Sequence, residues 1–330
     1  MTKQVALAIT AEDVRSAAVT IRGIAVRTPL LEYRFLNERV GTRVLVKYEG
    51  VQIGGAFKFR GAYNRLARIA YADRAKGVVA WSSGNHAQGV AAAARILGIP
   101  ATIVMPADAP AMKLANTYAL GAEVIRYDRE TESREAIAGA LSKERGAVLV
   151  PSFDDPYIIA GQGTAGLEIM EQAIELGARI GQVLVCCGGG GLVAGIATAI
   201  RDAQPEVTVW SVEPTAFDDT ARSLASGTRE AVPASAKSIC DALLCPRPGE
   251  LTFPINKALL AGGLSVSDEE VREAMRYAFE VMKLVIEPGG AVALAALLSG
   301  KAKPVQGATV VVVSGANVDA ELFAEAISSA

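Results

Sequence analysis

Short apolar strands alternate with helix-forming segments through the middle of the chain, and this alternation restricts the fold more than any other feature. Strands are predicted at 77–81, 102–106, 123–127 and 147–150, and helices between them at 90–97, 111–120 and 130–144. Units of this length predict a parallel sheet with right-handed crossovers. A further strand and helix follow at 183–187 and 193–201. The chain is therefore predicted to be an α/β protein.

Length and charge narrow the possible functions. The chain has 330 residues, enough for two domains, and its 51% hydrophobic content with 5% aromatic residues indicates a core of Ala, Val, Leu and Ile. A formal net charge of −2 argues against a nucleic acid or an anionic membrane as a partner. No apolar run reaches membrane-spanning length, and the N-terminus does not resemble a signal peptide, so a cytoplasmic location is expected.

The cysteines and the single histidine limit the chemistry that side chains alone could perform. His86 is the only histidine, and the cysteines, which form no Cys-x-x-Cys pair, are Cys186, Cys187, Cys240 and Cys245. A zinc site is therefore not expected. A nucleophile–His–acid triad could use only His86 as its histidine. We therefore expect the reactivity to come from a cofactor.

A lysine lies between two aromatic residues near the end of a predicted strand. The strand is expected at 43–49, and Phe57-Lys58-Phe59 precedes a helix predicted over 63–70. Apolar rings around an amine disfavour its ammonium form, and the neutral amine is the nucleophile that condenses with an aldehyde. An exposed lysine at the start of a helix would look the same in the sequence. The spacing alone leaves both interpretations open.

Two predicted strand-to-helix loops have the composition of anion-binding turns. One is Ser82-Ser83-Gly84-Asn85-His86, and the other is the tetraglycine run 188–191. Backbone N–H groups and the helix dipole converge on a negative group in such a turn, and glycine leaves room for a phosphate. The tetraglycine lacks the glycine spacing of dinucleotide sites, which argues against a nicotinamide-dependent oxidoreductase. From the residues alone, a capped turn at the first loop and a flexible hinge at the second remain possible.

These motifs resemble those of the fold-type II pyridoxal-phosphate enzymes, which include threonine and serine dehydratases, serine racemase and the synthases of cysteine and tryptophan. The string 56–62 is similar to the family's Ser-Phe-Lys-x-Arg-Gly-Ala signature, with Ala56 in place of Ser. Further similar strings lie at 82–89, 160–164, 287–291 and 314–317, where Ala316 replaces a glycine. The glycines of 160–164 suggest a tight loop before a helix at 165–176.

The resemblance implies a fold like that of the tryptophan synthase β subunit, with two domains that each contain a twisted, mostly parallel sheet flanked by helices. Residues 1–76 and 150–330 would form the large cofactor-binding domain, and 77–149 a small mobile domain that closes over the substrate. A homodimer is usual in the family and is expected. Because the chain ends soon after 314–317, no regulatory domain and no feedback control by isoleucine are expected, which favours amino-acid catabolism.

The resemblance also assigns roles to individual residues. Lys58 would hold pyridoxal 5′-phosphate through its amine and later move protons, and Ser83 matches the proton carrier on the opposite face in the racemases. The α-carboxylate of the substrate would be bound by Ser82, Ser83, Asn85 and His86. Asn85 would also approach the cofactor's 3′-oxygen. The other implied cofactor contacts are Phe57, a phosphate cup of Gly188, Gly189, Gly190, Gly191 and Leu192, and Ser314 at the pyridine nitrogen.

Two acidic residues could form a cation site. In some racemases and related dehydratases of the family, two acids at the spacing of Glu213 and Asp219 bind a divalent cation together with the intervening carbonyl, here that of Phe217. Two carboxylates, a carbonyl and water suit Mg²⁺ or Ca²⁺. Solvated loop acids would show the same spacing.

The predicted reaction is the dehydration of a small β-hydroxy amino acid. Ser314 at the ring nitrogen would make the ring a poorer electron sink than aspartate would, which suits removal of the α-proton coupled to loss of a β-hydroxyl. The products from L-threonine or L-serine would be a 2-oxo acid and ammonia. The strings 238–255 and 287–291 look most like bacterial threonine dehydratases, including a subgroup associated with hydroxyectoine breakdown.

Three alternatives stay open at this point. The first is an amino-acid racemase that uses Lys58 and Ser83. The second is a dehydratase of 3-hydroxyaspartate or of a hydroxyectoine-derived amino acid. The third is a binding protein on the same fold, against which the presence of Lys58, Ser83 and Asn85 argues.

Overall fold

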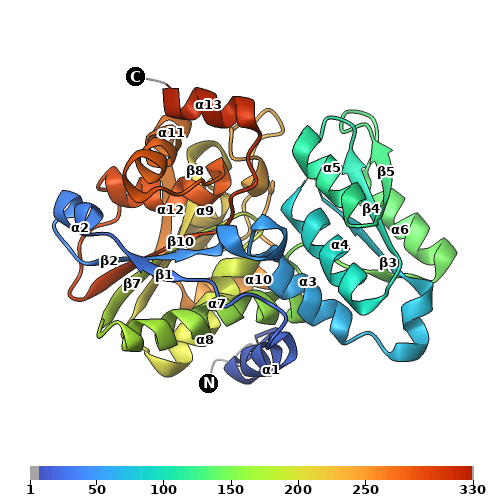
Figure 1. Ribbon diagram of the computed structural model, residues 1–330, viewed down its shortest axis with the longest axis horizontal. Helices are drawn as coiled ribbons and strands as arrows, with labels where there is room; N and C mark the ends of the chain where they lie inside the picture. Colours follow the sequence, from blue (N-terminus) through green and yellow to red (C-terminus); the bar gives the residue numbers. More distant parts are fainter. Residues whose placement is uncertain (1–6, 83, 329–330) are drawn as a thin grey trace.

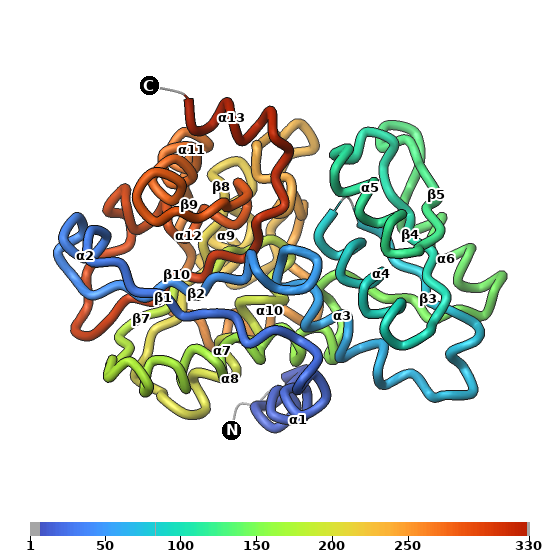
Figure 2. The backbone as a smooth tube through the Cα atoms, in the orientation of Figure 1, coloured from blue at the N-terminus to red at the C-terminus, as the bar shows by residue number. Residues whose placement is uncertain are grey.

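The computed structural model describes residues 7–82 and 84–328 and divides its strands between two sheets (Figure 1). One sheet has six strands in the order β1-β2-β10-β7-β8-β9, and the other has four in the order β5-β4-β3-β6. The four-stranded sheet is built from residues 78–149, and we call its part of the molecule the small unit. The part around the six-stranded sheet is the large unit. The two units lie side by side, as the backbone trace also shows (Figure 2).

The large sheet is parallel except for its first strand. Its strands are β1 (Leu30–Glu32), β2 (Val44–Tyr48), β7 (Ile180–Cys186), β8 (Thr208–Pro214), β9 (Gly262–Val266) and β10 (Ala308–Val313). Only β1 pairs antiparallel, with β2. All six residues of β10 are buried because the strand lies between β2 and β7 and has helices on both faces. This position explains the continuous apolar run, since a central parallel strand has no solvent face.

Helices cover both faces of this sheet and form two separate cores. Val310 and Val312 pack with α1 (Ala11–Ile21), α7 (Pro156–Glu175), α8 (Gly191–Ala203) and α10 (Thr252–Leu259). Val311 and Val313 pack with α2 (Arg34–Val40), α11 (Asp268–Tyr277), α12 (Pro288–Leu298) and α13 (Ala320–Ser328). The alternation of neighbouring valines between the two cores follows the two-residue period of a strand. A further helix, α9 (Asp219–Ser226), follows β8.

The small unit contains a fully parallel sheet. Its strands are β3 (Val78–Trp81), β4 (Ala101–Pro106), β5 (Glu123–Tyr127) and β6 (Val148–Leu149). Its helices are α4 (Asn85–Leu97), α5 (Ala111–Ala119) and α6 (Arg134–Arg145), and α3 (Lys58–Ala67) packs against α4. The predicted α/β fold with mostly parallel sheets is confirmed. That the small unit moves to close over a substrate stays a prediction.

Short helical turns complete the described chain. The 3₁₀ turns are η1 (Glu49–Val51), η2 (Ile53–Gly55), η3 (Tyr71–Lys76), η4 (Thr215–Phe217) and η5 (Asp241–Leu243), and a π-helical turn spans Ala278–Met282. Within residues 7–82 and 84–328, no helix has both the length and the apolar character needed to cross a membrane.

The prediction of a tight loop at 160–164 is wrong. Helix α7 begins at Pro156, with Asp155 as its N-cap, and runs through this string to Glu175. A Cβ atom at Gly161 would lie 2.7 Å from the carbonyl oxygen of Arg60, and one at Gly163 would lie 2.7 Å from that of Gly195. The glycines therefore allow α7 to cross α3 and α8 at close range, and they do not form a turn. Glycine serves close backbone approach as well as turns, and the sequence does not distinguish the two.

Helices α3 and α4 each begin five residues earlier than predicted. Helix α3 begins at Lys58, not near residue 63, and α4 begins at Asn85, not near residue 90. The candidate lysine and asparagine are therefore the first residues of their helices. The backbone that carries these two side chains is consequently regular helix and not a loop.

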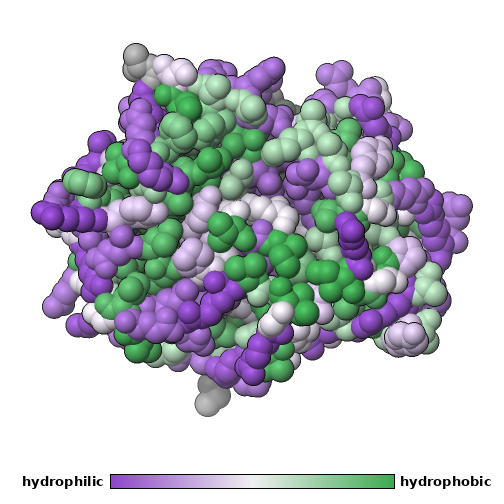
Figure 3. Space-filling view, viewed as in Figure 1, coloured by the Kyte–Doolittle hydropathy of each residue, from purple (hydrophilic) through white to green (hydrophobic). Residues whose placement is uncertain are grey.

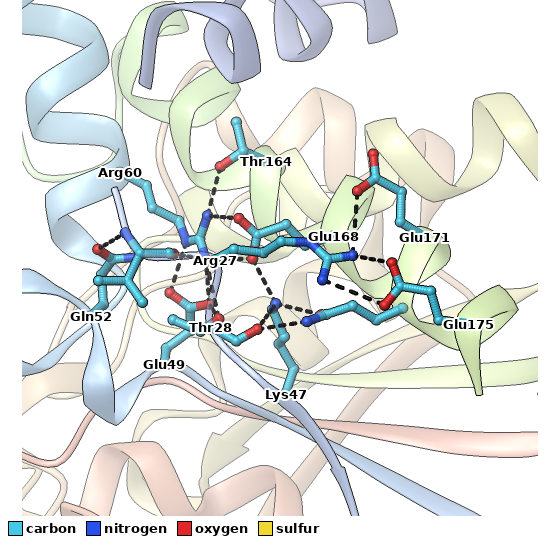
Figure 4. Close-up of polar contacts among 12 residues, drawn as sticks. Arg27, Thr28, Lys47, Glu49, Gln52, Arg60, Thr164, Glu168, Glu171 and Glu175 are labelled. Carbon is cyan, nitrogen blue, oxygen red and sulfur yellow. Dashed lines mark hydrogen bonds and ion pairs between the residues drawn. The ribbon is translucent and has the colours of Figure 1, made fainter. Parts of the chain in front are cut away.

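A buried ionic cluster fixes α3 to the large unit (Figure 4). Arg60 is fully buried and forms paired hydrogen bonds with Glu49 at 2.8 and 2.9 Å and with Glu168 of α7 at 2.7 and 2.8 Å. Lys47 of β2 donates to Glu168 at 2.6 Å and to the carbonyl oxygen of Thr28 at 2.7 Å. The two cations balance the two carboxylates, as burial of charge requires. The cluster thus holds the first turn of α3, the turn that carries Lys58.

Candidate active site

A cavity of about 220 Å³ lies where the two units meet. Its lining includes residues just beyond the carboxyl ends of three parallel strands, namely Ser82 after β3, Gly188 after β7 and Ser314 after β10. Ligands of open α/β sheets bind at the carboxyl ends of the strands. The candidate residues that line this cavity are Phe57, Lys58, Ser82, Asn85, His86, Gly188, Gly189, Gly190, Gly191, Leu192 and Ser314. Ser83 lies outside the described residues.

Lys58 presents a desolvated amine to the cavity. Its Nζ donates a hydrogen bond to the carbonyl oxygen of Ser152 at 2.7 Å and lies 5.2 Å from the centre of the Phe57 ring. Burial lowers the pKa of Lys58 from 10.5 to about 8. A much larger fraction of this amine is therefore neutral near neutral pH than is usual for lysine, which makes it available as a nucleophile or base.

The start of α4 offers backbone donors to an anion. Asn85 is the first residue of the helix, and Gln88 is the first whose N–H bonds back, to the carbonyl of Gly84. The N–H groups before Gln88 are free of helical partners, as at any helix N-terminus. The side chain of Ser82 accepts a hydrogen bond from the N–H of Gly84 at 3.1 Å. A substrate carboxylate would therefore meet backbone N–H groups here.

His86 is held as a neutral imidazole. Its Nε2 lies 3.0 Å from the carbonyl oxygen of Val150, so this nitrogen carries the proton. Burial, together with the charge of Lys58, lowers the pKa of His86 to about 3. The other nitrogen, Nδ1, is buried without a partner among the described residues and can only accept a hydrogen bond in this tautomer. The imidazole thus does not suit direct binding of a carboxylate, which favours the backbone donors of α4.

The tetraglycine run forms a turn that only glycine can make. Gly190 has a φ angle of +91°, in the left-handed region. A Cβ atom at Gly189 would lie 2.5 Å from the Phe153 ring, and one at Gly190 would lie 2.6 Å from Nδ2 of Asn256. Thr252 fixes the turn by donating to the carbonyl oxygen of Gly189 at 2.6 Å. The free N–H groups at the start of α8 therefore face the cavity without side chains in the way.

A buried amide beside this turn indicates that an anionic group completes the site. Gln162 is fully buried and lines the cavity, and neither its Nε2 nor its Oε1 has a partner within the described part of the chain. A Cβ atom at Gly191 would lie 2.8 Å from its Oε1. Buried amide groups without partners are rare, because each costs free energy. A phosphate over the glycine turn would give the Gln162 amide a partner.

The residues therefore fit pyridoxal 5′-phosphate. Lys58 supplies the amine for its aldehyde, the glycine turn and Gln162 suit its phosphate, and Ser314, which is 3% exposed, supplies a hydroxyl to the cavity. These three parts come from α3, the β7–α8 turn and the end of β10, which are far apart in sequence.

An ionic network that sequence reasoning missed lies beside the cavity. Lys113 of α5 is 2% exposed, and its Nζ lies 2.6 Å from Asp241 and 3.4 Å from Glu287. Asn85 donates to Glu287 at 2.5 Å and accepts from Asn317 at 2.9 Å. Burial raises the pKa of Glu287 to about 7, although Lys113 acts in the opposite direction. The network links the small unit to the large unit across the cavity.

The candidate cation site consists of two buried carboxylates. Glu213 lies near the end of strand β8 and Asp219 begins α9, and both are almost fully buried. The oxygens of Glu213 accept hydrogen bonds from the N–H groups of Thr220 and Ala221 at 2.9 and 2.8 Å, whereas Oδ2 of Asp219 is buried without a partner in the described structure. Burial raises the pKa of Asp219 to about 7. Across the described ranges, no three His, Cys, Asp or Glu side chains gather as a metal-binding group.

Comparison with known proteins agrees with this geometry. A family model described as pyridoxal-phosphate dependent enzyme matches residues 21–315. The L-threo-3-hydroxyaspartate ammonia-lyase of Pseudomonas sp is 45% identical over 94% of this chain and 96% of its own length. The serine racemase of Schizosaccharomyces pombe is 40% identical over 97% of each chain. The crystal structure of T.th. threonine deaminase superposes with a TM-score of 0.89 at 44% identity, covering 94% of this chain and 99% of that one.

These relatives confirm the predicted family resemblance and fold, and they include both an ammonia-lyase and a racemase. The chain belongs to the family of pyridoxal-phosphate dependent enzymes.

Proposed function

We propose that the protein is an ammonia-lyase that dehydrates a small β-hydroxy amino acid to a 2-oxo acid and ammonia. The observation that carries the proposal is that a single cavity holds the buried amine of Lys58, the glycine turn of 188–191 and the hydroxyl of Ser314. The Pseudomonas and T.th. relatives named above, an ammonia-lyase and a threonine deaminase, support the same reaction class.

The side chains divide the work as follows. When bound, pyridoxal phosphate supplies an electron sink that acidifies the α-hydrogen of the substrate. The first turn of α4 binds the α-carboxylate, and Lys58 accepts the α-proton with a pKa of about 8, close to the working pH of a general base. Ser314 offers a hydroxyl and no carboxylate at the end of β10, which favours rapid loss of the β-hydroxyl over a long-lived carbanion.

The experiment is an assay of the purified protein with L-threonine, L-serine and L-threo-3-hydroxyaspartate, in which the 2-oxo acid and the chirality of the remaining amino acid are measured together. We expect 2-oxo acid and an equal amount of ammonia from at least one substrate. Inverted amino acid without 2-oxo acid would replace the proposal with a racemase, the second candidate, which the 40% identity to a serine racemase favours. Absence of both products from all three substrates would contradict both functions.

We also propose that Glu213, the carbonyl of Phe217 and Asp219 bind Mg²⁺ or Ca²⁺ as a stabilising ion. Two buried carboxylates support a cation, because positive charge would offset the repulsion from Asp219 that, after burial, raises the pKa of Glu213, and because Oδ2 of Asp219 has no partner among the described residues. At a cation concentration ten times Kd, binding should stabilise the fold by about 1.4 kcal/mol. Thermal unfolding with and without chelator should show this increase in the wild type and not in Asp219→Asn. The control Asp218→Asn, which alters a partly exposed pair with Arg222, should retain it, and an equal response of both variants would contradict the site.

For the assembly we propose a homodimer in the cytoplasm. Exposed large apolar side chains support an interface, and Figure 3 shows apolar residues gathered in patches on the viewed face. The exposed apolar residues of the chain include Phe35, Val51, Phe279 and Val285. Contiguous exposed apolar surface is typical of interfaces between subunits.

A further inference from the structure

Four basic and three acidic side chains line the cavity. Besides Lys58, its cations are Lys113, Arg129 and Arg134. Lys113 is already bound by two carboxylates of the large unit. Arg129 donates to Asp108 at 2.7 Å, in a pair that is largely exposed to solvent. For Arg134, the hydrogen-bond partner found in the described structure does not explain why this side chain lies on the cavity wall.

Among the described residues, the guanidinium of Arg134 has a hydrogen-bond partner at Nε and none at its two terminal nitrogens. Arg134 is the first residue of α6, directly after the N-cap Ser133. Its Nε donates to Oε1 of Glu135 at 2.8 Å, whereas its Nη1 and Nη2 donate to no residue in the described ranges. The side chain is 34% exposed. The edge formed by Nη1 and Nη2 is the edge that binds a carboxylate through two parallel hydrogen bonds.

The carboxylates on the cavity wall do not compete for this edge. Asp154 accepts hydrogen bonds from the backbone N–H groups of Glu250, Leu251 and Thr252 at the start of α10. Asp241 is held by Lys113. Glu135 binds only the Nε side of Arg134. An anion that enters the cavity would therefore find the terminal nitrogens available.

The sheet order places Arg134 at the same edge of the small unit as the α-carboxylate position. Asn85 begins the helix after β3 and Arg134 begins the helix after β5, and both strands end at the same edge of the parallel sheet. The two helices pack on opposite faces of the sheet, α4 in the core that contains Ala80 and α6 in the core that contains Val79, and the first residue of each lines the cavity. The side chain of Arg134 therefore borders the same cavity as a ligand bound at the start of α4. The amine of Lys58 belongs to a residue that lines the same cavity as Arg134.

We propose that Arg134 forms a subsite for a second carboxylate, so that the preferred substrate is a dicarboxylic β-hydroxy amino acid such as 3-hydroxyaspartate. The inference rests on the proposed ammonia-lyase function and adds its substrate class. The α-carboxylate binds at the first turn of α4, and the guanidinium of Arg134 binds the distal carboxylate end-on. L-Serine and L-threonine have no second carboxylate to bind Nη1 and Nη2 of Arg134, so these nitrogens stay hydrated when either substrate is bound. A charged pair in a partly enclosed cavity discriminates between substrates more strongly than a methyl group does.

The test compares Arg134→Gln with Arg145→Gln, a matched substitution at the other end of the same helix, where Arg145 pairs with Glu123 outside the cavity. We expect kcat/KM for L-threo-3-hydroxyaspartate to fall about 100-fold in Arg134→Gln, the effect of losing one partner of a charged pair. For L-serine it should change less than about 3-fold, since no contact is lost. Arg134→Lys should recover part of the loss, because it keeps the charge without the paired donors. Arg145→Gln should leave both substrates unchanged.

Binding of substrates that cannot eliminate separates this inference from the proposed function. L-Aspartate and L-alanine differ by one carboxylate, and their Kd values can be read from the cofactor absorbance even if no 2-oxo acid forms. We expect Arg134→Gln to weaken L-aspartate at least about 10-fold and L-alanine hardly at all. Equal losses for both ligands would make Arg134 a structural residue and overturn the inference. Wild-type protein that dehydrates L-serine or L-threonine in preference to L-threo-3-hydroxyaspartate would overturn it and leave the proposed function standing.

Discussion

Replacing Lys58 with methionine is expected to lower kcat for 2-oxo acid formation by at least about 10³-fold, because the variant loses both the amine that attaches the cofactor and the base that takes the α-proton. Methionine keeps an unbranched side chain of similar length, so the packing against Phe57 is retained. The free energy of unfolding should change by no more than about 1 kcal/mol, since the only hydrogen bond lost among the described residues is the one to the carbonyl oxygen of Ser152. The substitution is therefore expected to lower kcat strongly while changing the free energy of unfolding little.

The measurements are single-turnover and steady-state assays, the absorbance of bound cofactor, and urea unfolding of the same preparations. Lys257→Met is the matched control, since this lysine is exposed and donates a hydrogen bond to the carbonyl oxygen of Gly227. The control should keep full activity. A Lys58→Met protein that turned over within about tenfold of the wild type would remove Lys58 from the mechanism.

The sequence allowed prediction of those parts of the site that are local in the chain. The tetraglycine run at 188–191 forms a turn that needs glycine, and the ring of Phe57 lies beside the amine of Lys58, so part of each geometry comes from neighbouring residues. The alternation of strands and helices predicts the parallel sheets, and this signal also lies in residues that are neighbours in the sequence. Each of these signals depends on neighbours in sequence, and the fold-class prediction drawn from them is confirmed.

The parts that could not be predicted depend on contacts between distant residues. Lys113 meets Asp241 and Glu287, which are 128 and 174 positions away, and nothing in the local pattern of a lysine on an amphipathic helix indicates such partners. Gly161 and Gly163 look like turn residues, so the sequence predicts a loop around Gln162. Their true role, the close crossing of α7 with α3 and α8, requires knowledge of which helices touch.

Replacing Arg60 with methionine is expected to destabilise the fold by about 3–5 kcal/mol, the typical cost of leaving buried charge without its partner. Glu168 would keep its ion pair with Lys47, whereas Glu49 would keep no ion pair among the described residues and would retain the hydrogen bond from the Thr28 hydroxyl. Although burial acts against ionisation, the Arg60 guanidinium lowers the pKa of Glu49, so this carboxylate is charged in the folded protein. Urea unfolding followed by circular dichroism should show a lower midpoint with an unchanged slope.

Two comparisons decide whether burial of the pair is the cause. Arg27→Met removes an exposed guanidinium that pairs with Glu175 at 2.6 Å in the same view (Figure 4), and it should cost less than about 1 kcal/mol. Adding Glu49→Gln to Arg60→Met should recover part of the stability, because it removes one uncompensated charge, and the two effects should be non-additive. A loss from Arg60→Met no larger than that from Arg27→Met would show that the cluster contributes little to the fold. The expected large loss would mean that the helix carrying Lys58 is fixed to the large unit by charge pairing as well as by apolar packing.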